Sequence, residues 1–592
     1  MCGIAGWISK NGSQIDLAQL EKINDKMKKR GPDGHGMWAN NDQTTAFAHR
    51  RLSIIDLSEG GAQPMSIESR GLTVTFNGEI YNYPELKQYC ENKGSMFKSS
   101  CDTEVLLHLY RLEGADFVKK LRGMYAFAIW DEEGKTAFLA RDPFGIKPLY
   151  YADTESGLIF ASQVKALLEA DCLAKSPISA AGLTSFLMWG YVIEPHTLYA
   201  TINALPAGHS ITLQSGKPPR LECFCDVTDY LRCKAPVISP GDLRAAIEET
   251  TQAHLLADVP VGIFLSAGID STTLAATLRY DQPKSELRGI TMGFEDYRGT
   301  PSDETILAAI CAEKFKIDHQ IRWIGKKEFH EHSADLLDAM DQPTVNGVNT
   351  YFVSQCAQEA GLKVAISGVG GDELFGGYPS YREIPKLVNY GKFVPATVGK
   401  ASRSILSRIL PRGKSPKTAG IIEYAKSVEQ AYILRRALHM PWEIEGILGK
   451  KLAEEGLENL QIEKILQKFT EGIEDDHRKI IALETAIYMR NCLLRDADWA
   501  GMAHSLEIRT PLVDIDLFRV LGGAKIGNLP VSKQDFALCP ALGLPEEVLN
   551  RPKSGFTVPV RDWLLEEGGA EAYRKRGLRG WSLYIAEHLG TL

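Results

Sequence analysis

The sequence lacks any apolar run long enough to cross a bilayer, and it has no strong bias of charge. Its best candidate, residues 180–193, is shorter than the ~18 residues that a span requires and is interrupted by Thr184, Ser185 and Gly190. The first residues have neither the basic nor the apolar region of a signal peptide. A net charge of −8 gives no support for a nucleic acid as the main partner. We therefore expect a cytoplasmic protein with no membrane span and no nucleic-acid partner.

The sequence also lacks a disulfide framework and a zinc motif. Its 11 cysteines are scattered, and no pair of cysteines combines with a second pair or with histidines at zinc-site spacing. This pattern fits reduced thiols in a cytosol. Cys2 is the exception, because removal of Met1 would leave it with two reactive groups. Its thiol is a nucleophile, and its free α-amine, with a pKa near ~8, can take the thiol proton.

The periodicity of the sequence changes along the chain and predicts two domains. Residues 1–214 consist of short strands with a few helices, which predicts an α+β sandwich. Residues 215–240 are rich in turn-forming residues and are the predicted linker. In residues 241–592 strands alternate with helices, which predicts an α/β doubly wound domain with a helical C-terminal part. The main predicted elements are strands 72–76, 125–130, 137–140, 259–265, 287–292 and 362–366, and helices 17–28, 102–110, 271–279 and much of 381–516.

Several polar residues of the first domain could bind an amino-acid substrate. The guanidinium of Arg51 can bind a carboxylate through two parallel hydrogen bonds. Asn77 and Gly78, after the predicted strand 72–76, offer an amide donor and a backbone N–H, the pair that an oxyanion hole needs. Glu79 and Asp102 could accept hydrogen bonds from a substrate ammonium group. The simpler alternatives are a hairpin turn at Asn77-Gly78 and a surface ion pair at Arg51.

A second group of polar residues, Ser-Ala-Gly-Ile-Asp-Ser at 266–271, lies between a predicted buried strand and a predicted helix. Backbone N–H groups and the helix dipole favour phosphate at such a turn. Asp270 would repel a phosphate unless a cation lay between them, which indicates Mg²⁺ on a polyphosphate. Asp372, in the loop after the predicted strand 362–366, could share that metal. No Gly-Lys-Ser or Gly-Lys-Thr follows, so transfer of a γ-phosphate is not favoured.

The first domain resembles the class II, N-terminal-nucleophile glutamine amidotransferases. The matching segments, in order, are 30–34, 51–54, 77–82, 123–127 and 141–149, where the last reads Arg-Asp-Pro-Phe-Gly-Ile-Lys-Pro-Leu. The resemblance implies a glutaminase in which Cys2 attacks the glutamine side-chain amide and releases ammonia, with Asn77 and Gly78 stabilising the oxyanion. It also implies that glutamine is bound by Arg51, Leu52, Ile54, Asn77, Gly78, Glu79 and Asp102. One departure is Gln163, where the family usually has glutamate.

The second domain resembles the ATP-dependent adenylating enzymes with a pyrophosphatase-type loop, of the adenine-nucleotide α-hydrolase-like fold. Together the two domains are similar to the glutamine-hydrolysing asparagine synthetases. This resemblance implies that ammonia attacks an acyl-adenylate made from ATP and aspartate, giving AMP and pyrophosphate, with Mg²⁺ held by Asp270 and Asp372. Lys553 would neutralise phosphate charge in the transition state. The expected nucleotide-binding residues are Phe264, Ser266, Gly268, Asp270, Ser271, Met292, Ser367 and Gly368.

Val369 limits the prediction of the substrate, because the resembled family often has a glutamate at this position. A carboxylate there could accept a proton from ammonium or from the tetrahedral adduct, and valine cannot. Glu373, another carboxylate or water would have to substitute, or the acceptor would differ. We predict asparagine synthesis first, with amidation of another carboxylate, such as a uronic acid in polysaccharide biosynthesis, as the alternative. The sequence leaves open whether the chain forms a homodimer.

Overall fold

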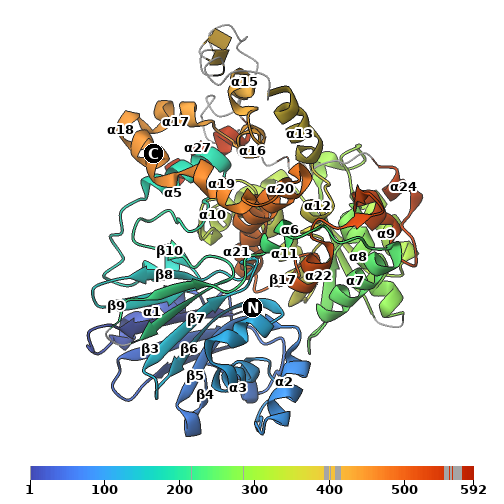
Figure 1. Ribbon diagram of the computed structural model, residues 1–592. Helices are drawn as coiled ribbons and strands as arrows, with labels where there is room; N and C mark the ends of the chain where they lie inside the picture. The colour runs from blue at the N-terminus through green and yellow to red at the C-terminus, as the bar shows by residue number, and fades with distance from the viewer. Residues whose placement is uncertain are drawn as a thin grey trace.

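The structure, a computed structural model, describes residues 2–214, 217–283, 286–391, 399, 402–403, 405–406, 415–551, 559, 563 and 577–592. Figure 1 shows a β-sandwich, coloured blue to teal, beside a second part that is built on a parallel sheet and extended by helices. The predicted order of an α+β sandwich followed by an α/β domain with a helical part is thus confirmed. Within the described residues, no helix is both long and apolar enough to span a membrane.

The sandwich consists of two six-stranded antiparallel sheets with orders β10-β8-β9-β1-β3-β2 and β12-β11-β7-β6-β5-β4. Alternate residues of each strand face inward, so that Ile4 and Ile8 of one sheet pack with Ala128 and Trp130 of the other. The strands are β1 (Gly3–Ser9), β2 (Gly34–Ala39), β3 (Thr45–Arg51), β4 (Met65–Ile67), β5 (Leu72–Ile80), β6 (Gly123–Asp131), β7 (Thr136–Arg141), β8 (Tyr150–Asp153), β9 (Gly157–Ala161), β10 (Asn203–Ala204), β11 (His209–Gln214) and β12 (Arg220–Cys223).

Helices cover the outer faces of the sandwich and complete four layers. Helix α1 (Leu17–Lys26) packs on the first sheet, and α2 (Tyr83–Asn92) and α3 (Thr103–Glu113) pack on the second. Helix α4 (Val164–Leu167) follows β9, and α5 (Ala180–Trp189) is buried at every position, as its all-round apolar sequence requires. Strand β12 and α6 (Asp229–Arg232) lie in the segment 215–240, and β12 pairs with β11 at the sheet edge.

The second part is built on a parallel sheet with the order β15-β14-β13-β16-β17. The order reverses direction at β13, so the loops after β13 and β16 lie side by side at the carboxyl edge, where ligands bind in doubly wound sheets. The strands are β13 (Val261–Phe264), β14 (Arg288–Phe294), β15 (Asp318–Ile324), β16 (Val364–Ile366) and β17 (Glu507–Arg509). Helices on its two faces are α7 (Pro240–Ala253), α8 (Ile269–Asp281), α9 (Thr305–Lys314), α10 (Lys326–Ala339) and α11 (Val348–Glu359).

The helical part lies between β16 and β17 in the sequence and above the sheet in Figure 1. Its elements are α12 (Gly371–Leu374), α13 (Ser380–Gly391), α15 (Ile421–Tyr424), α16 (Val428–Arg436), α17 (Pro441–Leu448), α18 (Lys450–Leu460), α19 (Ile462–Thr470), α20 (Asp476–Leu483), a π-helix (Glu484–Leu494) and α21 (Arg495–Ala503). The remaining elements are α22 (Ile515–Leu521), β18 (Lys525–Ile526), β19 (Leu529–Pro530), α23 (Lys533–Leu538), α24 (Glu546–Leu549) and α27 (Leu578–His588).

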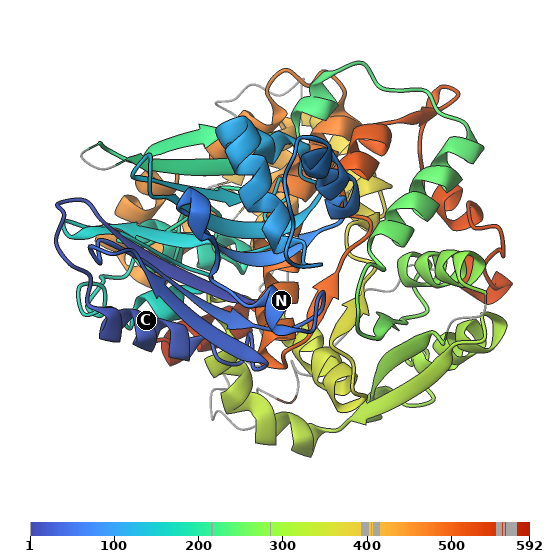
Figure 2. The ribbon, with the colours of Figure 1, turned by 90° about the horizontal axis from the view of Figure 1, so that it is seen from below.

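The segment predicted to be largely helical, about 381–516, is so in the structure but includes one strand, β17, at residues 507–509. This three-residue strand is the sheet edge that faces the sandwich, and its residues are all buried. In Figures 1 and 2 the N-terminus of the chain lies beside β17. The sheet edge of the second domain therefore lies next to the start of the first.

Candidate functional site

Cys2 lies directly before β1 and lines a small pocket at the end of the sandwich. Its backbone N–H donates to Asn77 Oδ1 at 2.9 Å, and its Sγ lies 4.0 Å from the carbonyl oxygen of Leu52. The pocket is also lined by predicted glutamine-binding residues, namely Arg51, Leu52, Ile54, Gly78, Glu79 and Asp102. Burial raises the pKa of the Cys2 thiol, so a base is needed to generate the thiolate at neutral pH. The structure thus brings residues from β1, β3, β5 and the start of α3 together around one thiol.

Asn77 and Gly78 have the properties that an oxyanion hole requires. Within the described residues, the buried Asn77 Nδ2 has no hydrogen-bond partner, which leaves one amide donor free. A Cβ on Gly78 would lie 2.1 Å from the carbonyl oxygen of Met124, so no larger residue fits. Both residues lie inside β5, which continues to Ile80 and pairs with β6 throughout. The prediction that the strand ends at Phe76 was therefore wrong, and Asn77-Gly78 is not a hairpin turn.

Two buried carboxylates form the part of the pocket expected to bind an ammonium group. Asp102 Oδ2 accepts a hydrogen bond from the Ile80 N–H at 3.0 Å, and burial raises the pKa of Asp102 to about 6. Burial also raises the pKa of Glu79 well above its ordinary value, and the nearby Glu507 adds to this shift. Two carboxylates in a buried pocket favour a cation between them. An α-ammonium group is such a cation.

The same pocket contains Arg51. Its guanidinium donates to the carbonyl oxygens of Ser58, at 2.9 Å, and Asp56, which holds it at the pocket wall. A fixed guanidinium and two carboxylates in one pocket match the carboxylate and ammonium groups of an amino acid.

Sequence reasoning assigned no role to Arg30, although it lies in a matching segment. Arg30 Nε donates to the carbonyl oxygen of Cys2 at 3.0 Å. Its two terminal nitrogens donate to the carboxylate of Asp498, on α21 of the second domain, at 2.7 and 3.0 Å. The main chain of Cys2 is therefore tied to the other domain through one buried arginine.

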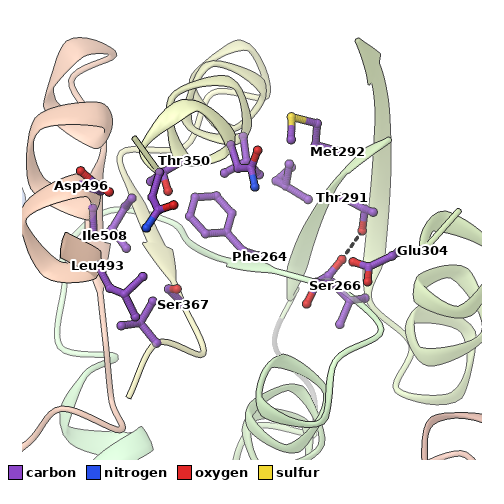
Figure 3. A pocket seen from close by; sticks show the side chains of 17 residues that line it. Phe264, Ser266, Thr291, Met292, Glu304, Thr350, Ser367, Leu493, Asp496 and Ile508 are labelled. Carbon is purple, nitrogen blue, oxygen red and sulfur yellow. Dashed lines mark hydrogen bonds between the residues drawn. The ribbon is translucent and has the colours of Figure 1, made fainter. Parts of the chain in front are cut away.

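A second pocket lies at the carboxyl edge of the parallel sheet, where the strand order reverses (Figure 3). Four of the predicted nucleotide-binding residues line it: Phe264, Ser266, Met292 and Ser367. Asn346, Asn349 and Thr350, before and at the start of α11, also line it and were missed by sequence reasoning. Asn and Thr patterns in loops carry no signal that separates a binding residue from a turn residue.

The other predicted nucleotide-binding residues lie beside this pocket, at the start of α8 and in the loop after β16. Gly268 is the N-cap of α8, and Ser271 Oγ accepts a hydrogen bond from the Ser266 N–H at 3.2 Å. A Cβ on Gly368 would lie 2.7 Å from the Cβ of Asp270, so the two loops pack closely. The backbone N–H groups at the N-terminus of the 13-residue α8 favour a phosphate there.

Asp270 and Asp372, the predicted metal ligands, are brought together by a lysine that sequence reasoning missed. Lys533 Nζ lies 2.8 Å from Asp372 Oδ1 and also contacts Asp270 Oδ1. Although burial lowers the pKa of Lys533, the two carboxylates raise it above its ordinary value. One cation bound by both carboxylates shows that the two side chains can share a positive charge. Carboxylate oxygens are ligands that Mg²⁺ prefers, so the residues fit that metal.

Val369 lies in the pocket wall, and its side chain cannot accept a proton. Another group must therefore take the proton that ammonium or the tetrahedral adduct loses. Burial and the nearby Asp372 raise the pKa of Glu373 to about 7. Its Oε1 accepts a hydrogen bond from Tyr378, and Glu373 is not among the residues that line the pocket. Asp496 on α21 does line the pocket, and burial raises its pKa to about 6. Asp496 is therefore the better placed of the two carboxylates. Lys553 lies outside the described residues.

Comparisons with known proteins agree with the two sites. Residues 1–222 match the family described as "Glutamine amidotransferase domain", and residues 242–583 match the family described as "Asparagine synthase". The chain is 33% identical to asparagine synthetase [glutamine-hydrolyzing] 1 of Bacillus subtilis, over 96% of this chain and 88% of that protein. It is 27% identical to asparagine synthetase [glutamine-hydrolyzing] 3 of the same organism, over 95% of this chain and 89% of that protein. The chain therefore belongs to the glutamine-hydrolysing asparagine synthetase family.

Proposed function

We propose that this protein makes asparagine from aspartate, ATP and glutamine, releasing glutamate, AMP and pyrophosphate. The observation that carries the proposal is the pocket in which Cys2 lies with Arg51, Glu79 and Asp102, on the same chain as a nucleotide-type pocket at the switch point of a parallel sheet. The first pocket suits an amino acid with a side-chain amide, and the second suits a nucleotide. The family relationship supports the pairing of the two.

In the glutaminase reaction, the thiol of Cys2 attacks the side-chain carbonyl of glutamine. The α-amine of Cys2, freed when Met1 is removed, takes the thiol proton and passes it to the departing ammonia. The Nδ2 of Asn77 and the N–H of Gly78 donate to the oxyanion of the tetrahedral intermediate. Water then cleaves the thioester, which gives glutamate and restores the thiol.

In the synthetase reaction, the β-carboxylate of aspartate attacks the α-phosphorus of ATP, and pyrophosphate leaves. The start of α8 and the loop after β16 hold the phosphates, while Phe264 and Met292 contact the base or the sugar. Ammonia then attacks the activated carbonyl and displaces AMP. Asp496, in the pocket wall, accepts the proton that the attacking nitrogen must lose.

Asp270 and Asp372 would hold Mg²⁺, which when bound offsets the negative charge of the triphosphate. Lys533 contacts both carboxylates and adds a positive charge beside the place proposed for the departing pyrophosphate. Lys553 adds a second positive charge in the proposed transition state, as the family resemblance implies.

The proposal is tested by incubating the protein with ATP, Mg²⁺, glutamine and aspartate and by measuring asparagine, AMP and pyrophosphate. We expect one AMP and one pyrophosphate per asparagine. Formation of ADP and orthophosphate would contradict the mechanism. A panel of other carboxylates, including a uronic acid, tests the acceptor under the same conditions. If pyrophosphate release is faster with one of them than with aspartate, that carboxylate and not aspartate is the substrate.

A further inference from the structure

Arg509 of the second domain reaches the glutamine pocket of the first. It ends β17, and its side chain is fully buried. Its Nη1 donates to the carbonyl oxygens of His254 and Leu256, at 2.8 and 2.7 Å, and its Nε lies 2.6 Å from Glu507 Oε1. Its Nη2 lies 3.3 Å from Glu79 Oε2. The guanidinium therefore joins two segments of the second domain, residues 254–256 and β17, to one carboxylate of the first.

Glu79 is held among other charged groups in the glutamine pocket. It lies in the pocket that contains Cys2, and its side chain is only 6% exposed. The groups whose charges act on it are the carboxylates of Glu507 and Asp102, which raise its pKa, and the guanidinium of Arg509 and the N-terminal amine, which lower it. Removing the guanidinium would raise the pKa of Glu79 further and would remove the ion pair at its Oε2. The carboxyl would then lose the contact that fixes its direction in the pocket.

The main chain of Arg509 is fixed by the nucleotide-binding half of the molecule. Arg509 is the register partner of Ile366 in the β16–β17 pair, and its carbonyl oxygen accepts the Ser367 N–H at 2.8 Å. Ser367 lines the nucleotide pocket. The side chain of Arg509 thus touches the glutamine site, while its backbone holds the first residue of a loop at the other site.

We propose that Arg509 is a positioning residue of the glutaminase: it fixes the Glu79 carboxyl and aims it at the glutamine α-ammonium group, so that the synthetase domain completes the glutamine site. This inference rests on the proposed function of the Cys2 pocket. Its consequence is that glutamine binds tightly only when the edge strand of the synthetase sheet is in place. Residues 1–222, the part matched by the glutaminase family, do not contain the complete site.

The test compares Arg509→Met and Arg509→Lys with wild type in full-length protein, using two assays. The first measures glutamate release without aspartate, which gives KM and kcat for glutamine. The second measures AMP formation from aspartate and added ammonium, which does not require the glutamine site and also reports on folding. Lys363→Met is the matched control, because Lys363 makes a 2.7 Å ion pair with Asp33 across the same interface but lines neither pocket.

We expect Arg509→Met to raise the glutamine KM by about tenfold or more, as the loss of one buried charge partner implies, with ammonium-dependent kcat within about twofold of wild type. Arg509→Lys should restore part of the loss, and Lys363→Met should behave as wild type. In Glu79→Gln protein, adding Arg509→Met should change the glutamine KM little, because the two residues act through one contact.

Three results would overturn the proposal. The first is an unchanged glutamine KM in Arg509→Met, and the second is an equal loss of activity in both assays for Arg509→Met and Arg509→Lys. The third is a glutamine KM in the double variant of Glu79→Gln with a change at Arg509 that equals the product of the two single effects. If Arg509→Met does not fold, Arg509→Lys with and without Glu79→Gln gives the same comparison. Failure of wild type to form AMP from aspartate would contradict the proposed synthetase reaction. It would not contradict the proposed role of Arg509, because the glutamine KM is measured without aspartate.

Discussion

The buried ion pair between Arg30 and Asp498 offers a test of how the two domains are held against each other. The two side chains are only 2% and 5% exposed, and two hydrogen bonds of 2.7 and 3.0 Å join them. Asp498→Asn keeps the shape of the side chain but removes its charge, which leaves the guanidinium of Arg30 buried without a counter-ion. Breaking one partner of a buried pair costs about 3–5 kcal/mol of the free energy of unfolding, and we expect the lower end because asparagine keeps one acceptor oxygen.

The double variant Arg30→Met with Asp498→Leu separates stability from catalysis. Replacing both members of a buried ion pair with apolar residues is often neutral, so we expect unfolding within about 1 kcal/mol of wild type. The variant nevertheless lacks the Arg30 Nε donor that holds the Cys2 carbonyl at 3.0 Å. Loss of a hydrogen bond of about 1–1.5 kcal/mol predicts a decrease of roughly tenfold in glutaminase kcat, with ammonium-dependent synthesis unchanged.

Urea unfolding followed by tryptophan fluorescence measures the stabilities, and glutamate release measures the activity. Lys363→Met is the control, because its ion pair with Asp33 is 39% and 28% exposed and should contribute less than about 1 kcal/mol. The reasoning is refuted if Asp498→Asn is as stable as wild type, or if the double variant is as unstable as the single one. Full glutaminase activity in the double variant would show that Arg30 does not position Cys2.

The remaining predictions concern single residues of the two sites. Cys2→Ala should abolish glutamine-dependent synthesis while leaving synthesis from added ammonium intact, measured as asparagine formed; equal loss of both would contradict two separable sites. Because burial raises the pKa of Asp102 to about 6, its carboxyl is protonated and neutral below that pH. The glutamine KM should therefore rise as the pH falls from about 7 to about 5, and Asp102→Asn should flatten this profile; a flat profile in wild type would exclude Asp102 from ammonium binding. Asp270→Asn should remove ATP-dependent pyrophosphate release but spare basal glutamate release. Lys533→Met should raise the KM for ATP about tenfold, and an unchanged KM would remove Lys533 from the phosphate site.

Local pattern predicted most elements of the fold but not all of their boundaries. The prediction of a strand at 72–76 was correct, but β5 extends beyond it to Ile80. Pairing with β6 overrides the turn preference of Asn77-Gly78. Strand β17 was missed because three residues inside a helical region give no periodic signal. Its strand conformation comes from pairing with β16, which lies about 140 residues earlier in the chain.

The sequence by itself determined which groups are predicted to react. Cys2, the Asn77-Gly78 donors and the loop at 266–271 each depend on neighbouring residues, and chemistry of this kind can be read from local spacing. The tertiary structure alone decided which residues hold those groups in place. Arg509, Asp498 and Lys533 contact partners that lie between about 160 and 470 positions away, and such contacts depend on how strands and helices pack. Charged residues that look like ordinary surface side chains in the sequence lie at the two pockets because packing buried them beside partners of opposite charge.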